Sequence, residues 1–262
     1  MSQILHLLLY QPILNALILL YKLLFYNLGG AIIFLTIIIR LFLIPLTNPQ
    51  LQSAQKMQEL APQLEKFKEK YKNDKQKLMQ AQMELYKKNG VNPAAGCLPQ
   101  ILQFVILISL YQVFNQVIRP GTEVIENINR NLYSFIRLPQ QASLNFHFLY
   151  LDLSKPDVIP LQGSFGLPGI FVILATVFQF FTSKMMMPSV RVEQKEAKLT
   201  EEKSDDMALA MQKQMLYLFP AMTLIFGYTL PSGVILYWFV FSLFSFVQQL
   251  AITKKKKGVV KT

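Results

Sequence analysis

Long apolar runs alternate with polar, basic segments along the chain. Five runs approach the ~20 residues that a helix needs to cross a bilayer, and they occupy residues 30–47, 94–117, 166–187, 213–230 and 233–252. The last two runs are joined by Pro231-Ser232-Gly233, a combination typical of a tight turn. This pattern predicts an all-α polytopic membrane protein whose core, residues 29–252, is a bundle of five transmembrane helices.

The first apolar stretch, residues 4–27, is interrupted by polar side chains at a helical spacing. Gln11, Asn15 and Lys22 stand at positions i, i+4 and i+11, on one face of a helix. Residues 1–28 are therefore predicted to form an amphipathic extracytoplasmic helix that lies in the membrane interface. A full transmembrane span is the alternative for this segment.

Residues 49–92 are abruptly polar and carry the pattern of a helical hairpin. Apolar positions recur at three- and four-residue steps from Leu51 to Tyr71, which indicates a helix. Asp74 is placed to cap a second helix over 75–88, and Gly90 is placed to end it in the left-handed conformation.

Basic residues are distributed unequally between the remaining segments. The hairpin holds nine Lys, the stretch 184–213 six Lys+Arg and the tail 253–262 five Lys, whereas the longer loop 118–165 holds four Lys+Arg. By the positive-inside rule the hairpin, the charged loop 188–212 and the C-terminus lie in the cytoplasm. The N-terminus and the loop 118–165, with short elements at most, lie outside a cell membrane.

The composition argues against catalysis at membrane depth. The chain has 26 Lys+Arg and 15 Asp+Glu, and all fifteen acidic residues fall outside the five apolar runs. One cysteine, Cys97, and two histidines give no disulfide and no plausible metal cluster. We expect no enzyme activity, no cofactor and no metal, and ion-coupled transport also usually needs a carboxylate at this depth.

Arg40 is a charge inside an apolar run, FLTIIIRLFLIPLT. A guanidinium in hydrocarbon costs roughly 2.5–3.5 kcal/mol on insertion scales. Snorkelling, or bonds to backbone carbonyls near Pro45, would be a purely structural explanation. Thr47 is seven residues away, ~10 Å along a helix, a long reach that favours a water-filled cavity open to the cytoplasm.

Several motifs together resemble one family. They are RLFLIPLTNPQ around Arg40, NGVNP followed by GCLP before the second run, LYLDLSKPD in the outer loop and LPSGVILYW between the last two runs. With the lysine-rich hairpin, this order resembles the YidC/Oxa/Alb insertases over nearly all of residues 10–252. The chain is similar to the short forms, without a large extracytoplasmic domain.

The resemblance implies a membrane protein insertase and chaperone with a hydrophilic groove, closed on the outside and open to the cytoplasm and to lipid. The groove arginine of the family matches Arg40, and the other groove positions match Gln103, Gln179 and Trp238. On their own, the two glutamines would suggest interhelical hydrogen bonds and the tryptophan packing.

Partners follow from the same reading. Substrates would be nascent membrane proteins, contacted by Met57, Met79 and Met83 of the hairpin. The basic residues Lys254, Lys255, Lys256 and Lys257 would contact the ribosome or anionic lipid; the Sec translocon is a further candidate partner, and DNA is not expected. Two alternatives remain at this point: an anion-binding transporter, and an assembly factor that translocates nothing.

Overall fold

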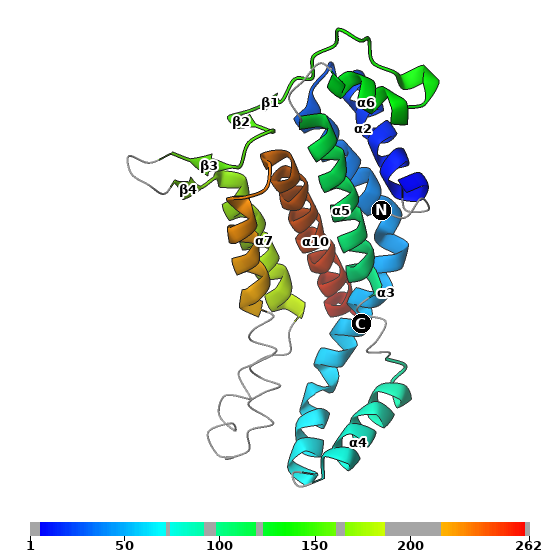
Figure 1. Ribbon diagram of the computed structural model, residues 1–262. Coiled ribbons are helices and arrows are strands. Elements are labelled where there is room, and N and C mark those ends of the chain that lie inside the picture. The colour runs from blue at the N-terminus through cyan, green and yellow to red at the C-terminus, as the bar shows by residue number, and fades with distance from the viewer. Residues whose placement is uncertain are drawn as a thin grey trace.

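The computed structural model describes residues 6–71, 74–91, 98–118, 123–160, 166–186 and 216–259. Its architecture is all-α, with helices packed side by side and short strands at one end (Figure 1). The helical elements are η1 (His6–Tyr10), α2 (Gln11–Leu23), α3 (Leu28–Lys70), α4 (Lys75–Lys88), α5 (Leu98–Ile118), α6 (Glu123–Asn131), η3 (Ser134–Ile136), α7 (Ile170–Met186), the helix Leu216–Gly227 and α10 (Ser232–Val259). The predicted loop 188–212 and Cys97 lie outside the described residues.

The longest element, α3, corrects the predicted boundary between the first span and the hairpin. The sequence predicts a span over residues 30–47 and a separate helix that begins at Leu51. The structure instead continues one 43-residue helix through Pro45, Pro49 and Pro62. Proline removes one backbone hydrogen bond and crowds the preceding turn, but packing neighbours and nearby hydroxyl groups can compensate in a membrane helix.

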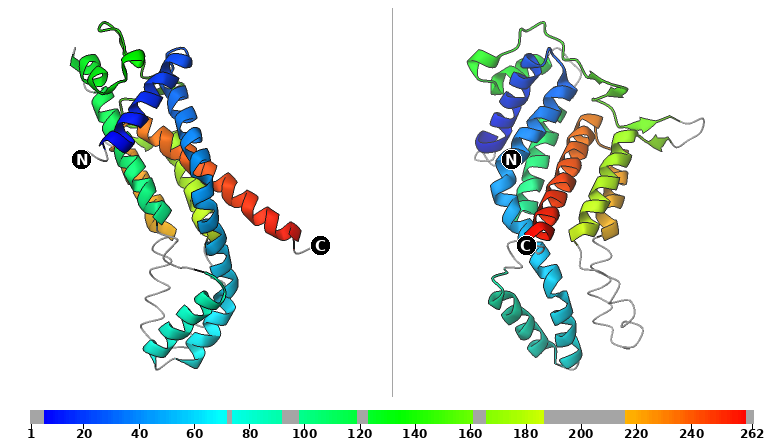
Figure 2. Two further views of the ribbon diagram at one scale, coloured as in Figure 1. Left: turned by 90° about the vertical axis from the view of Figure 1, so that its right-hand side faces the viewer. Right: turned by 180° about the vertical axis from the view of Figure 1, so that it is seen from behind.

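The predicted hairpin is confirmed in its second half. Asp74 precedes α4, and its carboxylate accepts a hydrogen bond from the Lys77 amide at 3.0 Å. Gly90 follows α4 with φ = 64°, the left-handed conformation that glycine adopts without strain. A small apolar cluster centred on Leu60 and Leu85 holds the two arms together, and the hairpin projects beyond the helical bundle (Figure 2).

The N-terminal segment packs against the bundle. Leu14, Leu17 and Ile18 of α2 are fully buried in the main core. The Asn15 side chain, on the predicted polar face, is buried; its Nδ2 donates to the Asn131 carbonyl at 3.0 Å and its Oδ1 accepts from the Tyr133 amide at 2.7 Å. These buried partners explain why a polar residue is tolerated on this face.

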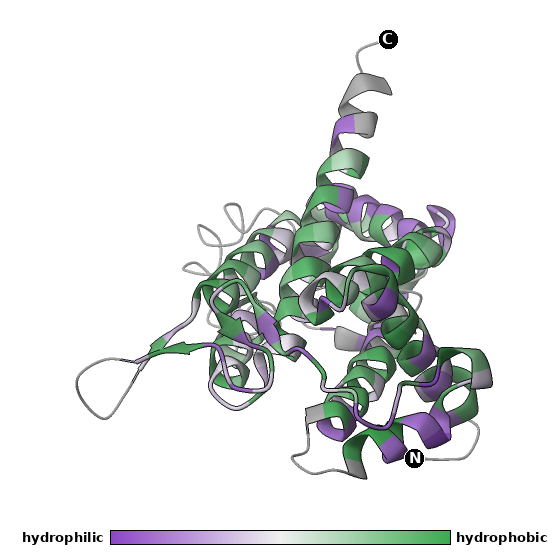
Figure 3. Ribbon diagram, turned by 90° about the horizontal axis from the view of Figure 1, so that it is seen from above, coloured by the Kyte–Doolittle hydropathy of each residue, from purple (hydrophilic) through white to green (hydrophobic). Residues whose placement is uncertain are grey.

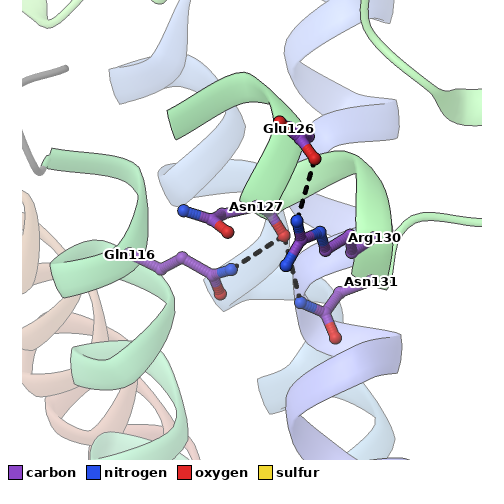
Figure 4. Close-up of polar contacts among 5 residues, drawn as sticks. All are labelled: Gln116, Glu126, Asn127, Arg130 and Asn131. Carbon is purple, nitrogen blue, oxygen red and sulfur yellow. Dashed lines mark hydrogen bonds and ion pairs between the residues drawn. The ribbon is translucent and has the colours of Figure 1, made fainter. Parts of the chain in front are cut away.

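The segment 118–165 contains short elements, as predicted. Helix α6 buries Ile125 and Ile128 and exposes Glu126 and Arg130, which form an ion pair at 2.8 Å. Figure 4 shows how α6 meets α5: Gln116 Nε2 donates to the carbonyl of Asn127 at 2.9 Å. After η3 come two antiparallel strand pairs, β1 (His147–Phe148) with β2 (Leu151–Asp152), and β3 (Val158–Ile159) with β4 (Leu167–Pro168).

Three helices of the described residues are long and apolar enough to cross a membrane, by length and composition: His6–Leu23, Leu28–Leu64 and Ser232–Lys254. Shorter apolar helices occupy Leu102–Val117, Ile170–Met185 and Leu216–Gly227, within the three other predicted spans. The chain is therefore an all-α membrane protein, and five spans stay a prediction. The spanning alternative for the N-terminal segment also meets the length criterion.

Candidate functional site: a polar cavity around Arg40

A cavity of about 290 Å³ lies between α3, α5, α7, the helix Leu216–Gly227 and α10. The four predicted groove residues all line it: Arg40, Gln103, Gln179 and Trp238. They come from four different helices, so only the folded bundle brings them together. Among the described residues, no acidic side chain lines this cavity. The binding role of these four residues stays a prediction.

Arg40 lies in the wall of the cavity and is 8% exposed. Its Nη2 donates a hydrogen bond to Ser245 Oγ on α10. Its Cζ lies 4.2 Å from the centroid of the Phe241 ring and 5.3 Å from that of Phe244. A guanidinium within about 6 Å of an aromatic face gains roughly 0.5–2 kcal/mol. Neutral groups thus hold the charge, and none of the described residues that line the cavity is acidic and could compensate it.

The other predicted groove residues are held by hydrogen bonds and ring contacts. Gln103 Nε2 donates to the Tyr237 hydroxyl at 2.6 Å. Gln179 Oε1 accepts from Thr223 Oγ1 at 2.5 Å. These bonds fix one end of each amide, so that its orientation in the cavity wall is defined. Trp238 packs against Phe226, with ring centroids 6.1 Å apart.

Below Arg40, toward the hairpin, α3 and α10 are joined by polar side chains. Gln248 Nε2 donates to Thr47 Oγ1 at 2.9 Å and to Asn48 Oδ1 at 2.8 Å. Further toward the hairpin, Gln55 Nε2 of α3 donates to Thr253 Oγ1 of α10 at 3.0 Å. This end of the cavity is therefore bordered by groups that water can solvate.

At the opposite end the same helices form an apolar layer. Phe114 of α5 and Val234 of α10 are fully buried there, as are Leu28 and Ala31 of α3. The packing is close at Gly233, where an added Cβ would lie 2.5 Å from the Phe114 ring. The polar cavity and the apolar layer thus occupy opposite halves of one bundle.

The predicted contact residues outside the cavity lie in different environments. Met79 and Met83 are 62% and 54% exposed and one helical turn apart on α4. Met57 instead packs against the apolar cluster inside the hairpin. Lys254 is exposed, and α10 continues as a helix through Lys254–Lys257 to Val259, so the start of the basic tail is helical. Its C-terminal end projects away from the bundle (Figures 2 and 3).

Sequence reasoning missed the residues that hold Arg40 and Gln103 in place. Phe241 and Ser245 contact Arg40, and Tyr237, which precedes them on α10, accepts the hydrogen bond from Gln103. A signal was present, since Trp238, Phe241, Ser245 and Gln248 follow three- and four-residue steps along one helical face. The partner of that face, Arg40, is too distant in sequence for the spacing to reveal it.

The cavity and the helices around it define a multi-pass, all-α membrane protein with a buried cation that has no acidic partner among the residues that the structure describes. Comparison with known proteins is consistent with this class. The family model described as "60Kd inner membrane protein" matches residues 19–259. The chain therefore belongs to the 60Kd inner membrane protein family, that of the YidC/Oxa/Alb insertases, and is a multi-pass protein of the cell membrane.

Individual relatives carry the name "Membrane protein insertase YidC". One from Fusobacterium nucleatum is 35% identical over 87% of this chain and 87% of its own length. "Membrane protein insertase YidC 1" from Halalkalibacterium halodurans is 32% identical over 89% of this chain and 72% of its own. The relative from Wolinella succinogenes is 32% identical over 87% of this chain, which spans 34% of that longer protein.

Proposed function

We propose that this protein is a membrane protein insertase that receives acidic or polar segments of nascent membrane proteins at Arg40 and then releases apolar segments to lipid. The observation that carries the proposal is the guanidinium in the cavity wall, held by Ser245 and two rings, with no acidic side chain among the described lining residues. The names of the relatives support the same function.

The driving forces have comparable sizes. A carboxylate ~4 Å from Arg40 gains roughly 4 kcal/mol at an effective dielectric of 20. Inserting one charged side chain costs roughly 2.5–3.5 kcal/mol on translocon scales. Contact with Arg40 is therefore of the same order as the cost of moving one acidic residue into the bilayer, and arginine keeps its charge at this depth.

Apolar surfaces next to the cavity provide the route into lipid. Ile170, Ile173, Val177 and Phe181 are exposed along one side of α7. The spacing of these residues makes a continuous stripe on the helix. An incoming apolar segment would move along this stripe into the bilayer, and the burial of ~20 apolar residues drives the step without a nucleotide or cofactor.

The distribution of positive charge supports an orientation with the hairpin and the C-terminus in the cytoplasm and the N-terminus outside. In this orientation the five predicted helices surround a cavity that opens toward the hairpin. Met79 and Met83 offer the emerging chain an adaptable apolar contact. The basic end of α10 attracts ribosomal RNA or anionic lipid through phosphate groups, without reading sequence.

Reconstitution tests the function directly. The purified protein in liposomes should protect the acidic tail of a single-span substrate from added protease, whereas liposomes without the protein should not. Saturable flux of a small anion without tail protection would favour the transporter alternative. Binding of spans without tail protection would favour the assembly factor, and either result would contradict the proposal.

A further inference from the structure

The outer loop lies across the ends of two helices that wall the cavity. In Figure 1, β1 and β2 lie beside the start of α10, and β3 and β4 lie beside the start of α7. The segment 153–157 joins the two strand pairs. It includes Asp157, which is 2% exposed and is the only acidic side chain buried among the described residues.

The Asp157 side chain binds the first turn of α7. Its Oδ2 accepts hydrogen bonds from the amides of Phe171 at 3.1 Å and Val172 at 3.3 Å. Its Oδ1 accepts from the Tyr150 hydroxyl at 2.9 Å, and that hydroxyl in turn accepts from the Ile170 amide at 3.0 Å. A carboxylate suits this position because the unpaired amides and the helix dipole both favour negative charge.

The backbone of Gly169 packs closely against Asp157. The Gly169 amide donates to the Asp157 carbonyl at 2.8 Å. An added Cβ on Gly169 would lie 1.7 Å from Asp157 Oδ1, so only glycine fits beside the carboxylate. The loop and the start of α7 are therefore in close contact at Asp157 and Gly169.

The same loop also binds the start of α10. The Ser232 amide donates to the Lys155 carbonyl at 2.7 Å, and the Gly233 amide donates to the Leu153 carbonyl at 3.1 Å. Ser232 Oγ donates to the Asp152 carbonyl at 2.7 Å. One short segment thus satisfies the first amides of two cavity helices that are distant in sequence.

We propose that Asp157 is the positioning residue of an outer clasp, residues 152–157, that keeps the cavity closed on the outside while substrates enter from the cytoplasm. The inference rests on the proposed function, since it takes the cavity to be open on the cytoplasmic side. Val172 of α7 is fully buried, as are Phe114 and Val234 of the apolar layer at this end of the bundle. Without the carboxylate, the first amides of α7 lose their hydrogen bonds to Asp157, the start of the helix moves, and the apolar layer no longer separates the cavity from the outside.

Chemical labelling tests the clasp without using insertion activity. Cys97 is the single cysteine, so Cys97→Ser gives a background for one reporter, Met222→Cys, at a half-buried position that lines the cavity. A membrane-impermeant maleimide is added to the outside of intact cells. With Asp157 present the reporter should stay unlabelled, and Asp157→Ala should raise the labelling rate at least tenfold. Asp157→Asn should give an intermediate rate because the amide keeps one acceptor oxygen.

Asp152→Ala is the matched control. Asp152 is also an acidic residue of the loop, but its side chain contacts Ser154 and Lys155 of the same loop rather than the amides of α7, and its link to Ser232 runs through the backbone. This variant should remain unlabelled from outside. If Asp157→Ala is not produced as folded protein, Asp157→Asn and Tyr150→Phe each remove part of the same network and are scored in the same way.

The outcomes separate the clasp from the function it rests on. The clasp is overturned if outside labelling stays at the parent rate in every folded Asp157 variant and in Tyr150→Phe. It is also overturned if Asp152→Ala is labelled from outside as fast as Asp157→Ala. Inverted membrane vesicles expose the cytoplasmic side to the reagent. If the reporter protein with Asp157 intact is not labelled in these vesicles, the cavity is not open to the cytoplasm and the proposed function is contradicted. The labelling rates measured from outside would still decide the role of Asp157.

Discussion

Arg40 Nη2 donates a hydrogen bond to Ser245 Oγ across 205 residues of sequence, and this bond joins α3 to α10 at the wall of the cavity. The serine is neutral and itself donates to the Phe241 carbonyl at 2.8 Å. The pair therefore holds the guanidinium in place without cancelling its charge. A carboxylate that enters the cavity meets a cation whose position is already fixed, which lowers the entropy lost on binding.

The first prediction concerns the charge of Arg40. Arg40→Ala should slow insertion of an acidic-tailed substrate at least about tenfold, which corresponds to about 1.4 kcal/mol, while a substrate with a neutral tail changes little. Arg40→Lys should keep much of the acidic-tail activity because the charge remains. Protease protection in liposomes measures both substrates. Arg130→Ala, at an exposed arginine outside the cavity, is the charge-matched control.

The second prediction concerns the ring beneath the guanidinium. Phe241→Leu should destabilise the protein through lost packing and lost cation–π attraction, and the second part should vanish when Arg40 is already replaced by Met. The coupling energy from thermal unfolding in detergent should be about 0.5–2 kcal/mol. Strictly additive effects of the two substitutions would show that the ring contact contributes nothing specific.

The third prediction concerns the close approach of α7 and the helix Leu216–Gly227. A Cβ on Gly227 would lie 2.5 Å from Val172 Cγ1. Gly227→Ala should therefore cost about 1–3 kcal/mol by overpacking. Val172→Ala in the same chain should restore part of that loss, because it removes the atoms in the way. If the double variant unfolds at the temperature expected from adding the two single effects, the helices do not meet here.

The fourth prediction concerns pH. Burial, together with the hydrogen bond to Asp157, raises the pKa of the Tyr150 phenol from 10.0 to about 12. Because the folded pKa is raised, the contribution of this group to stability is fully present below pH 10 and is lost as the pH rises through about 12. Difference absorbance of the phenolate between the parent and Tyr150→Phe should show a midpoint near 12. A midpoint near 10 would contradict this environment.

The fifth prediction separates the methionines of the hairpin. Met79→Gln with Met83→Gln should weaken crosslinking of a nascent chain to α4 and leave the thermal stability of the hairpin unchanged, because both side chains are exposed. Met57→Gln should instead destabilise the hairpin, since Met57 packs against its apolar cluster. Equal crosslinking losses from both variants at equal stability would assign the three methionines one common role.

The sequence allowed local features to be predicted better than long-range ones. The cap at Asp74 and the left-handed Gly90 follow from side-chain and backbone chemistry within a few residues, and both are confirmed. The continuity of α3 through Pro45 could not be predicted because it depends on packing and on bonds to α10. The buried environment of Asn15 depends likewise on a segment more than a hundred residues away.

The candidate site shows the same division. Arg40 was evident as a charge without a local partner, but the residues that hold it, Ser245 and Phe241, belong to a helix far along the chain. Asp157 was part of a motif whose chemistry the sequence left unexplained. Its role in binding the start of α7 depends on a backbone contact that no spacing rule describes.

The uninterrupted helix α3 has a mechanical consequence. It is a single rod of 43 residues, ~65 Å long at 1.5 Å per residue, that carries Arg40 in the cavity and continues into the hairpin. Its three internal prolines, Pro45, Pro49 and Pro62, all lie between Arg40 and the hairpin tip, and a helix bends most readily at proline. The hairpin arm would therefore follow a bound chain by bending at these positions, while Ser245 keeps the guanidinium in place in the cavity.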